Sequence, residues 1–142
     1  MSGCDLLIRR ARVIDGSGGD ARCADVAVAG ERIVAVGTDL DCGAGEVVDA
    51  SGLVLAPGFI DVHTHDDTNV IRTPEMLPKL SQGVTTVIVG NCGISAAPVQ
   101  LKDEPPDPMN LLGDAGVFKY PTFAAYVVAV DAARPSVNVA AL

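Results

Sequence analysis

The two histidines of the chain, His63 and His65, lie two positions apart in the segment GFIDVHTHDD, directly after an apolar run. Side chains of a β-strand alternate between its two faces, so both imidazoles project from one face if this segment is a strand. Two neighbouring imidazoles suggest a metal site. The alternative is a pair of histidines that only satisfies local hydrogen bonds, and the motif by itself leaves both interpretations open.

Cys92 is the third candidate ligand, because it follows another apolar run, VTTVIV, in the stretch GNCGIS. In proteins built from βα repeats, active sites gather where parallel strands end at their carboxyl side. Neighbouring parallel strands lie about 4.8 Å apart, so a thiolate and two imidazoles at such ends can converge on one or two ions. Zinc accepts mixed nitrogen and sulfur ligands. A packed thiol is the alternative for Cys92 alone, whereas the three residues together predict a zinc site.

Acidic residues surround the two histidines and have open roles. Asp61 either orients an imidazole through its free ring N–H or bonds only to the backbone. Asp66 and Asp67 are either metal ligands or acids at the start of a helix, and we favour the helix start.

The elements that position these residues change in character at Pro57-Gly58. Residues 1–57 show short β-type runs with turns about every ten residues, and Ala29-Gly30-Glu31-Arg32 predicts a tight hairpin. This part is expected to be a small β-sandwich-like domain. Residues 58–142 read instead as an α/β unit.

The α/β unit is expected to contain three buried, parallel strands and two helices. Strands are predicted at 58–65 and 83–91 and from about residue 135 onward, and helices at 73–82 and 122–133. Thr122 is the expected N-cap of the second helix. Residues 98–121 are rich in proline and acid and predict a long loop. Because a third parallel strand needs neighbours, we expect a truncated part of a larger protein; a complete small α+β protein is the alternative.

The composition excludes several classes of function. A formal net charge of -8 argues against nucleic acid as a partner, since such binding depends on clustered Lys and Arg. No apolar stretch has the length of a signal peptide or membrane span, so a soluble, cytoplasmic protein without a membrane partner is expected. Without a CxxC pair, Cys4, Cys23 and Cys42 are expected to be free thiols with structural or surface roles. The oligomeric state stays open.

The sequence resembles the amidohydrolase superfamily in the segment LAPGFIDVHTH, which follows a β-rich segment. It resembles the D-aminoacylase (N-acyl-D-amino-acid deacylase) branch of that superfamily in the segment GVTTVIVGNCGISAAP. The resemblance covers essentially the whole chain. It implies that residues 1–57 are the N-terminal part of a small β-domain, and that residues 58–142 are the first strands and helices of a (β/α)8 TIM-type barrel.

The resemblance also implies roles for individual residues. Cys92 would hold a tightly bound zinc ion together with two histidines from later strands, while His63 and His65 would line a companion metal position. The general acid/base aspartate is expected downstream of Leu142, so the chain contains no catalytic residue of its own and is expected to be inactive alone.

The implied function is zinc-dependent removal of the acyl group from a small molecule, an N-acyl-D-amino acid. Two alternatives remain. One is a cyclic amide or imide hydrolase of the same superfamily, and the other is a catalytically silent, truncated metal-binding module.

Overall fold

The computed structural model describes residues 3–142, and the chain divides between Pro57 and Gly58 into two compact units. This division lies where the sequence changes from short β-type runs to an α/β pattern. Each unit has its own hydrophobic core, as expected when apolar side chains are buried within separately packed layers.

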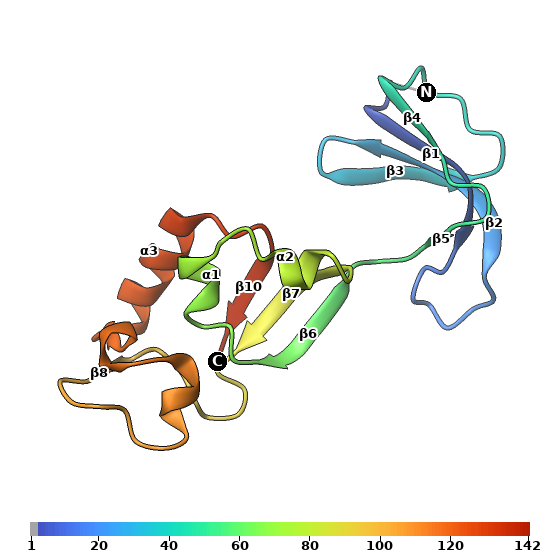
Figure 1. The fold of residues 1–142 in the computed structure, drawn as a ribbon. Coiled ribbons are helices and arrows are strands. Elements are labelled where there is room, and N and C mark those ends of the chain that lie inside the picture. Colours follow the sequence, from blue (N-terminus) through green and yellow to red (C-terminus); the bar gives the residue numbers. More distant parts are fainter. Residues whose placement is uncertain (1–2) are drawn as a thin grey trace. The chain divides into compact units, whose positions relative to one another are not determined.

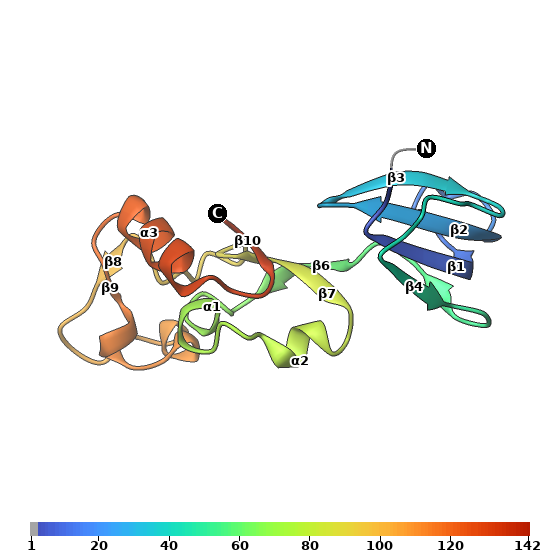
Figure 2. The ribbon, with the colours of Figure 1, turned by 90° about the horizontal axis from the view of Figure 1, so that it is seen from above.

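The N-terminal unit is one five-stranded sheet. Its strand order is β3-β2-β1-β4, with β5 also paired to β1. Figure 2 shows β3, β2, β1 and β4 in this order across the sheet. β1 pairs antiparallel with β2 but parallel with β4 and β5. The strands are β1 (Leu6–Val13), β2 (Arg22–Ala29), β3 (Arg32–Gly37), β4 (Glu46–Asp49) and β5 (Val54–Leu55).

The predicted hairpin is confirmed at the junction of β2 and β3. Ala29 pairs with Arg32, which leaves Gly30 and Glu31 as a two-residue connection. Gly30 has φ +56°, a left-handed conformation that glycine adopts without a steric penalty from a Cβ atom. The turn chemistry visible in the sequence therefore fixes this connection.

The expectation of free thiols is wrong for two of the cysteines. Cys4 and Cys42 form a disulfide with a Cα–Cα distance of 5.5 Å, and both side chains are buried. The backbone N–H of Cys4 also donates a hydrogen bond to the carbonyl of Cys42. These residues are 38 positions apart, so the spacing of cysteines in the sequence gives no indication of the pairing; Cys23 is a free, exposed thiol, as expected.

The C-terminal unit is built on three parallel strands in the order β10-β7-β6, with α3 beside β10 (Figures 1 and 2). Along the chain the three strands occur in the predicted order, β6, β7 and β10, with helical segments between them. The elements are β6 (Phe59–Thr64), α1 (Asn69–Arg72), α2 (Leu77–Leu80), β7 (Val84–Val89), β8 (Val99–Gln100), the 3-10 helices Met109–Leu112 and Ala115–Val117, β9 (Lys119–Tyr120), α3 (Phe123–Ala133) and β10 (Asn138–Ala141).

The helix predicted over residues 73–82 is wrong in its extent. The structure has two separate four-residue helices, α1 and α2, and Met76 between them adopts a left-handed conformation with φ +47°. Pro78 lies in the first turn of α2, where its missing N–H costs no hydrogen bond, whereas inside a longer helix it would break one. The proline therefore decides where the second helix begins.

Helix α3 matches the prediction closely. Thr122 is its N-cap, and the Thr122 hydroxyl accepts a hydrogen bond from the backbone N–H of Ala125. An apolar face is expected from Phe123, Tyr126, Val127 and Val130; Tyr126 and Val130 are buried in the core, whereas Phe123 and Val127 are 41% and 39% exposed. The long loop at 98–121 is largely irregular, as predicted, but it contains the short β8–β9 pair and places Phe118 in the core.

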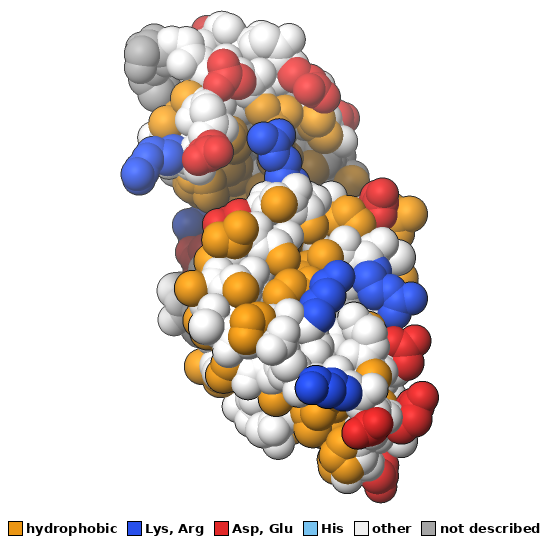
Figure 3. Space-filling view, turned by 90° about the vertical axis from the view of Figure 1, so that its left-hand side faces the viewer, with side chains coloured by type: hydrophobic (Ala, Val, Ile, Leu, Met, Phe, Trp, Pro, Cys, Tyr) orange, Lys and Arg blue, Asp and Glu red, His pale blue; other side chains and the backbone are white. Residues whose placement is uncertain are grey.

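Strand β6 differs from the expectation of a buried strand. β7 lies between two strands and buries Val87 and Val89 completely, whereas β6 is paired on one side only. On β6, Phe59, Ile60 and Val62 are 55–64% exposed. Apolar side chains are also visible across the surface in Figure 3. An apolar sequence is thus not sufficient for burial, which also requires neighbours on both sides of the strand. None of the helices in the described part of the chain has the length and apolar character needed to cross a membrane.

Candidate metal centre

The two histidines lie at the carboxyl end of β6. The strand ends at the buried Thr64, and the rings of His63 and His65 have centroids 5.9 Å apart, tilted by 45°. The pairing with β7 is irregular here, since three steps along β6, from residue 61 to 64, match two steps along β7. Such a bulge re-aims side chains and often occurs beside active sites.

Cys92 lies in a tight turn that directly follows β7. The backbone N–H of Gly93 donates to the carbonyl of Gly90 at 2.9 Å, and both glycines have positive φ, +80° and +82°. This conformation suits glycine and disfavours other residues. The glycines of GNCG therefore allow the chain to turn back over the strand end, with the cysteine at the tip of the turn.

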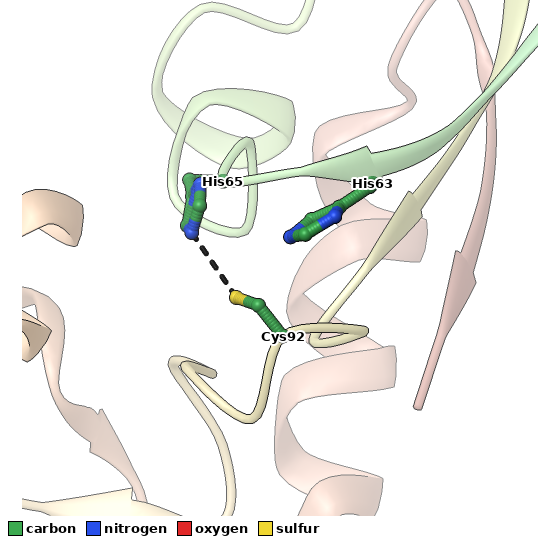
Figure 4. A group of neighbouring side chains, drawn as sticks. All are labelled: His63, His65 and Cys92. Carbon is green, nitrogen blue, oxygen red and sulfur yellow. Dashed lines mark hydrogen bonds between the residues drawn. The ribbon is translucent and has the colours of Figure 1, made fainter.

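The structure brings all three predicted ligands together (Figure 4). The Sγ atom of Cys92 is 3.1 Å from Nε2 of His65, and one ligand atom from each of the three residues lies within 4.8 Å of the others. In a tetrahedral zinc site, a sulfur at about 2.3 Å and a nitrogen at about 2.0 Å are about 3.5 Å apart. His63 and Cys92 are exposed and His65 is half-buried, so the donor set fits zinc and leaves room for further ligands.

A lysine that sequence analysis missed supports this strand end. Lys79 of α2 places Nζ 2.6 Å from Oδ2 of Asp61, 2.9 Å from Oδ2 of Asp66 and 3.1 Å from Oγ1 of Thr64. Lys79 and Asp61 are 18 residues apart, and no motif of the sequence connects them. Only the packing of α2 against the sheet, next to β7, brings the lysine to the carboxylates.

The pKa values of this cluster follow from its contacts. The hydrogen bond from Lys79 is the largest influence on Asp61 and lowers its pKa. Burial raises the pKa of Asp66, but hydrogen bonds from Asn69, Thr64 and Lys79 outweigh it, and the net shift is downward. Partial burial likewise disfavours the charged form of Lys79, yet its two carboxylate partners raise its pKa. All three groups are thus held in their charged forms.

The open roles of the acidic residues are now defined. Asp61 accepts a hydrogen bond from the backbone N–H of His63 at 3.3 Å, as in the backbone alternative, but it also binds the Lys79 side chain, which neither alternative included. Helix α1 begins at Asn69 after the N-cap Thr68, which makes no side-chain cap bond. Asp66 and Asp67 directly precede this helix, as the helix-start alternative requires, but neither carboxylate caps the helix backbone.

Asp67 is instead completely buried. One carboxylate oxygen accepts a hydrogen bond from the backbone N–H of Ala96 at 3.1 Å, while the other has no hydrogen-bond partner among the described residues. Burial is the largest influence and raises the pKa of Asp67. The hydroxyl of Tyr126 donates to the backbone carbonyl of Asp67 at 2.9 Å, and burial raises the pKa of Tyr126 as well. Sequence analysis gave no indication of this burial.

Comparisons with known proteins agree with this arrangement. A family model described as "Amidohydrolase family" matches residues 46–142. The chain is 49% identical over 138 residues to a D-aminoacylase of Alcaligenes xylosoxydans xylosoxydans, covering 97% of this chain and 28% of the relative. It is 50% identical over 135 residues to an N-acyl-D-aspartate deacylase of the same organism, covering 95% of this chain and 27% of the relative.

A solved structure is similar over almost the whole chain. It is the crystal structure of an N-acyl-D-glutamate deacylase from Bordetella bronchiseptica, complexed with zinc and a phosphonate inhibitor that mimics the tetrahedral intermediate of the reaction. The TM-score is 0.86 at 46% identity, covering 99% of this chain and 29% of that structure's chain. The present chain therefore spans less than a third of the length of these relatives.

Proposed function

Because the chain belongs to the amidohydrolase family, we propose that it is the N-terminal part of a zinc-dependent hydrolase that removes the acyl group from N-acyl-D-amino acids. Its C-terminal unit contains the first strands and helices of the TIM-type barrel of that family. The similar proteins are named as deacylases of N-acyl-D-amino acids with different side chains, which supports this substrate class.

The observation that carries the proposal is the convergence of Cys92 with His63 and His65. These donors come from the ends of two adjacent parallel strands and lie within 4.8 Å of one another. One sulfur and two nitrogens form a donor set that zinc accepts. We therefore assign the three residues as zinc ligands.

When bound, zinc would supply a Lewis acid that polarises the scissile carbonyl and makes hydroxide available near neutral pH. The residues of this chain have separate tasks. His63, His65 and Cys92 would hold the ion at the carboxyl end of the strands. Lys79 engages the carboxylates of Asp61 and Asp66 and neutralises part of their charge beside the strand end that carries the histidines.

The test uses the full-length gene product that contains this chain. It is supplied with zinc and incubated with the N-acetyl derivatives of D-methionine, D-aspartate and D-glutamate, with the corresponding L-compounds as controls. We expect release of free D-amino acid that stops when a chelator removes the metal and returns when zinc is added. Zinc binding without turnover, or a preference for a cyclic amide such as a hydantoin, would contradict the proposal.

A further inference from the structure

Two cross-links fasten the Cys92 turn to the segment that carries the histidines. On one side, the side-chain amide of Asn91 donates to the backbone carbonyl of Val62 at 2.8 Å. On the other side, the backbone N–H of Ala96 donates to the carboxylate of Asp67 at 3.1 Å. Asn91 directly precedes the cysteine and Val62 directly precedes His63, so the first cross-link ties together the immediate neighbours of two candidate ligands.

The second cross-link is anchored in the core. Asp67 and Ala96 are both completely buried, and the backbone carbonyl of Asp67 also accepts a hydrogen bond from the Tyr126 hydroxyl. A buried carboxylate with one oxygen unpaired among the described residues costs free energy. The hydrogen bond from the Ala96 N–H gives this carboxylate a partner and fixes residue 96 relative to residue 67.

The turn itself is closed by one backbone hydrogen bond, from the N–H of Gly93 to the carbonyl of Gly90. Asn91, Cys92 and Gly93 are exposed, and the turn contains two glycines with positive φ. A metal site tolerates errors of only about 0.5 Å in the position of its donors. The position of the sulfur relative to the imidazoles thus depends on the contacts that hold the chain on either side of Cys92, at Asn91 and at Ala96.

We propose that Asn91 and Asp67 are positioning residues, which hold the Cys92 sulfur within coordinating distance of His63 and His65. This inference rests on the proposed zinc site and adds to it two residues that are not ligands. Loss of residues that orient metal ligands without binding the metal typically weakens metal affinity by about 10–100-fold.

The test measures cadmium binding by the metal-free, full-length gene product. Cadmium replaces zinc, and thiolate coordination gives an ultraviolet charge-transfer absorption. The part of this absorption that is lost in Cys92→Ser reports coordination by Cys92, and chelator competition gives the affinity. Asn91→Ala removes the first cross-link, and Asn110→Ala, at an exposed asparagine in the 98–121 loop, is its matched control. Asp67→Ala removes the second, whereas Asp67→Asn keeps an oxygen that can accept the Ala96 N–H.

We expect Asn91→Ala and Asp67→Ala to weaken Cys92-dependent binding about 10–100-fold, with Asp67→Asn and Asn110→Ala near the wild type. If the wild type shows this absorption and Asn91→Ala binds as tightly, the positioning role is refuted while the zinc site stands. Equal losses in Asp67→Asn and Asp67→Ala would refute the role of the Asp67 hydrogen bond. Absence of any Cys92-dependent absorption in the wild type would refute the proposed function itself. Should Asp67→Ala fail to fold, Asn91→Ala decides the outcome.

Discussion

Lys79→Met should loosen the strand end that carries the histidines, because it removes the only cation that contacts both carboxylates of the described cluster. The ammonium group makes two ion pairs and a hydrogen bond to Thr64. Methionine retains most of the aliphatic stem but leaves the carboxylates of Asp61 and Asp66 facing each other without a counter-charge. The change therefore isolates the charged contacts from the packing of the side chain.

The size of the effect follows from the exposure of the three groups. The side chains of Lys79, Asp61 and Asp66 are 23%, 30% and 13% exposed. An exposed ion pair contributes about 0.2–1 kcal/mol, whereas breaking a buried pair costs about 3–5 kcal/mol. Mostly shielded groups belong between these limits, so we expect about 2 kcal/mol, which corresponds to an increase of about 30-fold in the local opening equilibrium.

Hydrogen exchange of the full-length gene product, followed by mass spectrometry, measures this opening in the peptide covering residues 59–67. Lys102→Met, at an exposed lysine in the loop after β8, provides the matched control. Faster exchange in Lys79→Met alone, confined to β6 and its neighbours, is the expected result. If both variants exchange this peptide at the same rate, the ion-pair cluster does not stabilise the strand end.

Three further predictions concern pH, metal binding and packing. Lys79 lowers the pKa of its carboxylate partner Asp61. The ion pair therefore contributes fully to folding stability above the unfolded carboxylate pKa of about 4, and this contribution is lost as the pH falls through the folded pKa. The difference in thermal midpoint between wild type and Lys79→Met should be constant near neutral pH and shrink below about pH 4. Cys92→Ser should weaken zinc binding at least about tenfold, measured by metal analysis after dialysis, whereas Cys23→Ser at the other free thiol should retain the metal. Tyr126→Phe leaves the buried carbonyl of Asp67 without its donor, so it should destabilise the protein by about 1–3 kcal/mol, and an unchanged thermal midpoint would contradict this.

Local patterns predicted much of the fold. The two-residue hairpin at Gly30, the N-cap at Thr122 and the order of the parallel strands follow from turn residues, capping and hydrophobic runs. The same patterns predicted the three candidate ligands, because parallel strands carry the residues at their ends to one edge of the sheet. These signals act within a few residues of the chain, or through the regular spacing of strands.

The extent of the first helical region was not predictable from hydrophobic spacing. Met76, Leu77 and Leu80 fit one helix face, but Pro78 is tolerated only near a helix start. In this chain β6 is less buried than expected, because it has a neighbouring strand on one side only and the chain spans less than a third of its relatives. Hydrophobic periodicity reports which residues are apolar, but neither where a proline starts a helix nor which neighbours cover a strand.

The sequence by itself determined which residues can coordinate a metal and at which strand ends they lie. Only the tertiary structure decided which distant residues contact one another: the Cys4–Cys42 disulfide of the N-terminal unit, the ion pair of Lys79 with Asp61 and the hydrogen bond from Ala96 to the buried Asp67 join residues 18 to 38 positions apart. Such contacts form when strands and helices pack, and the free energy of that packing is shared among many side chains. No short stretch of sequence therefore specifies them.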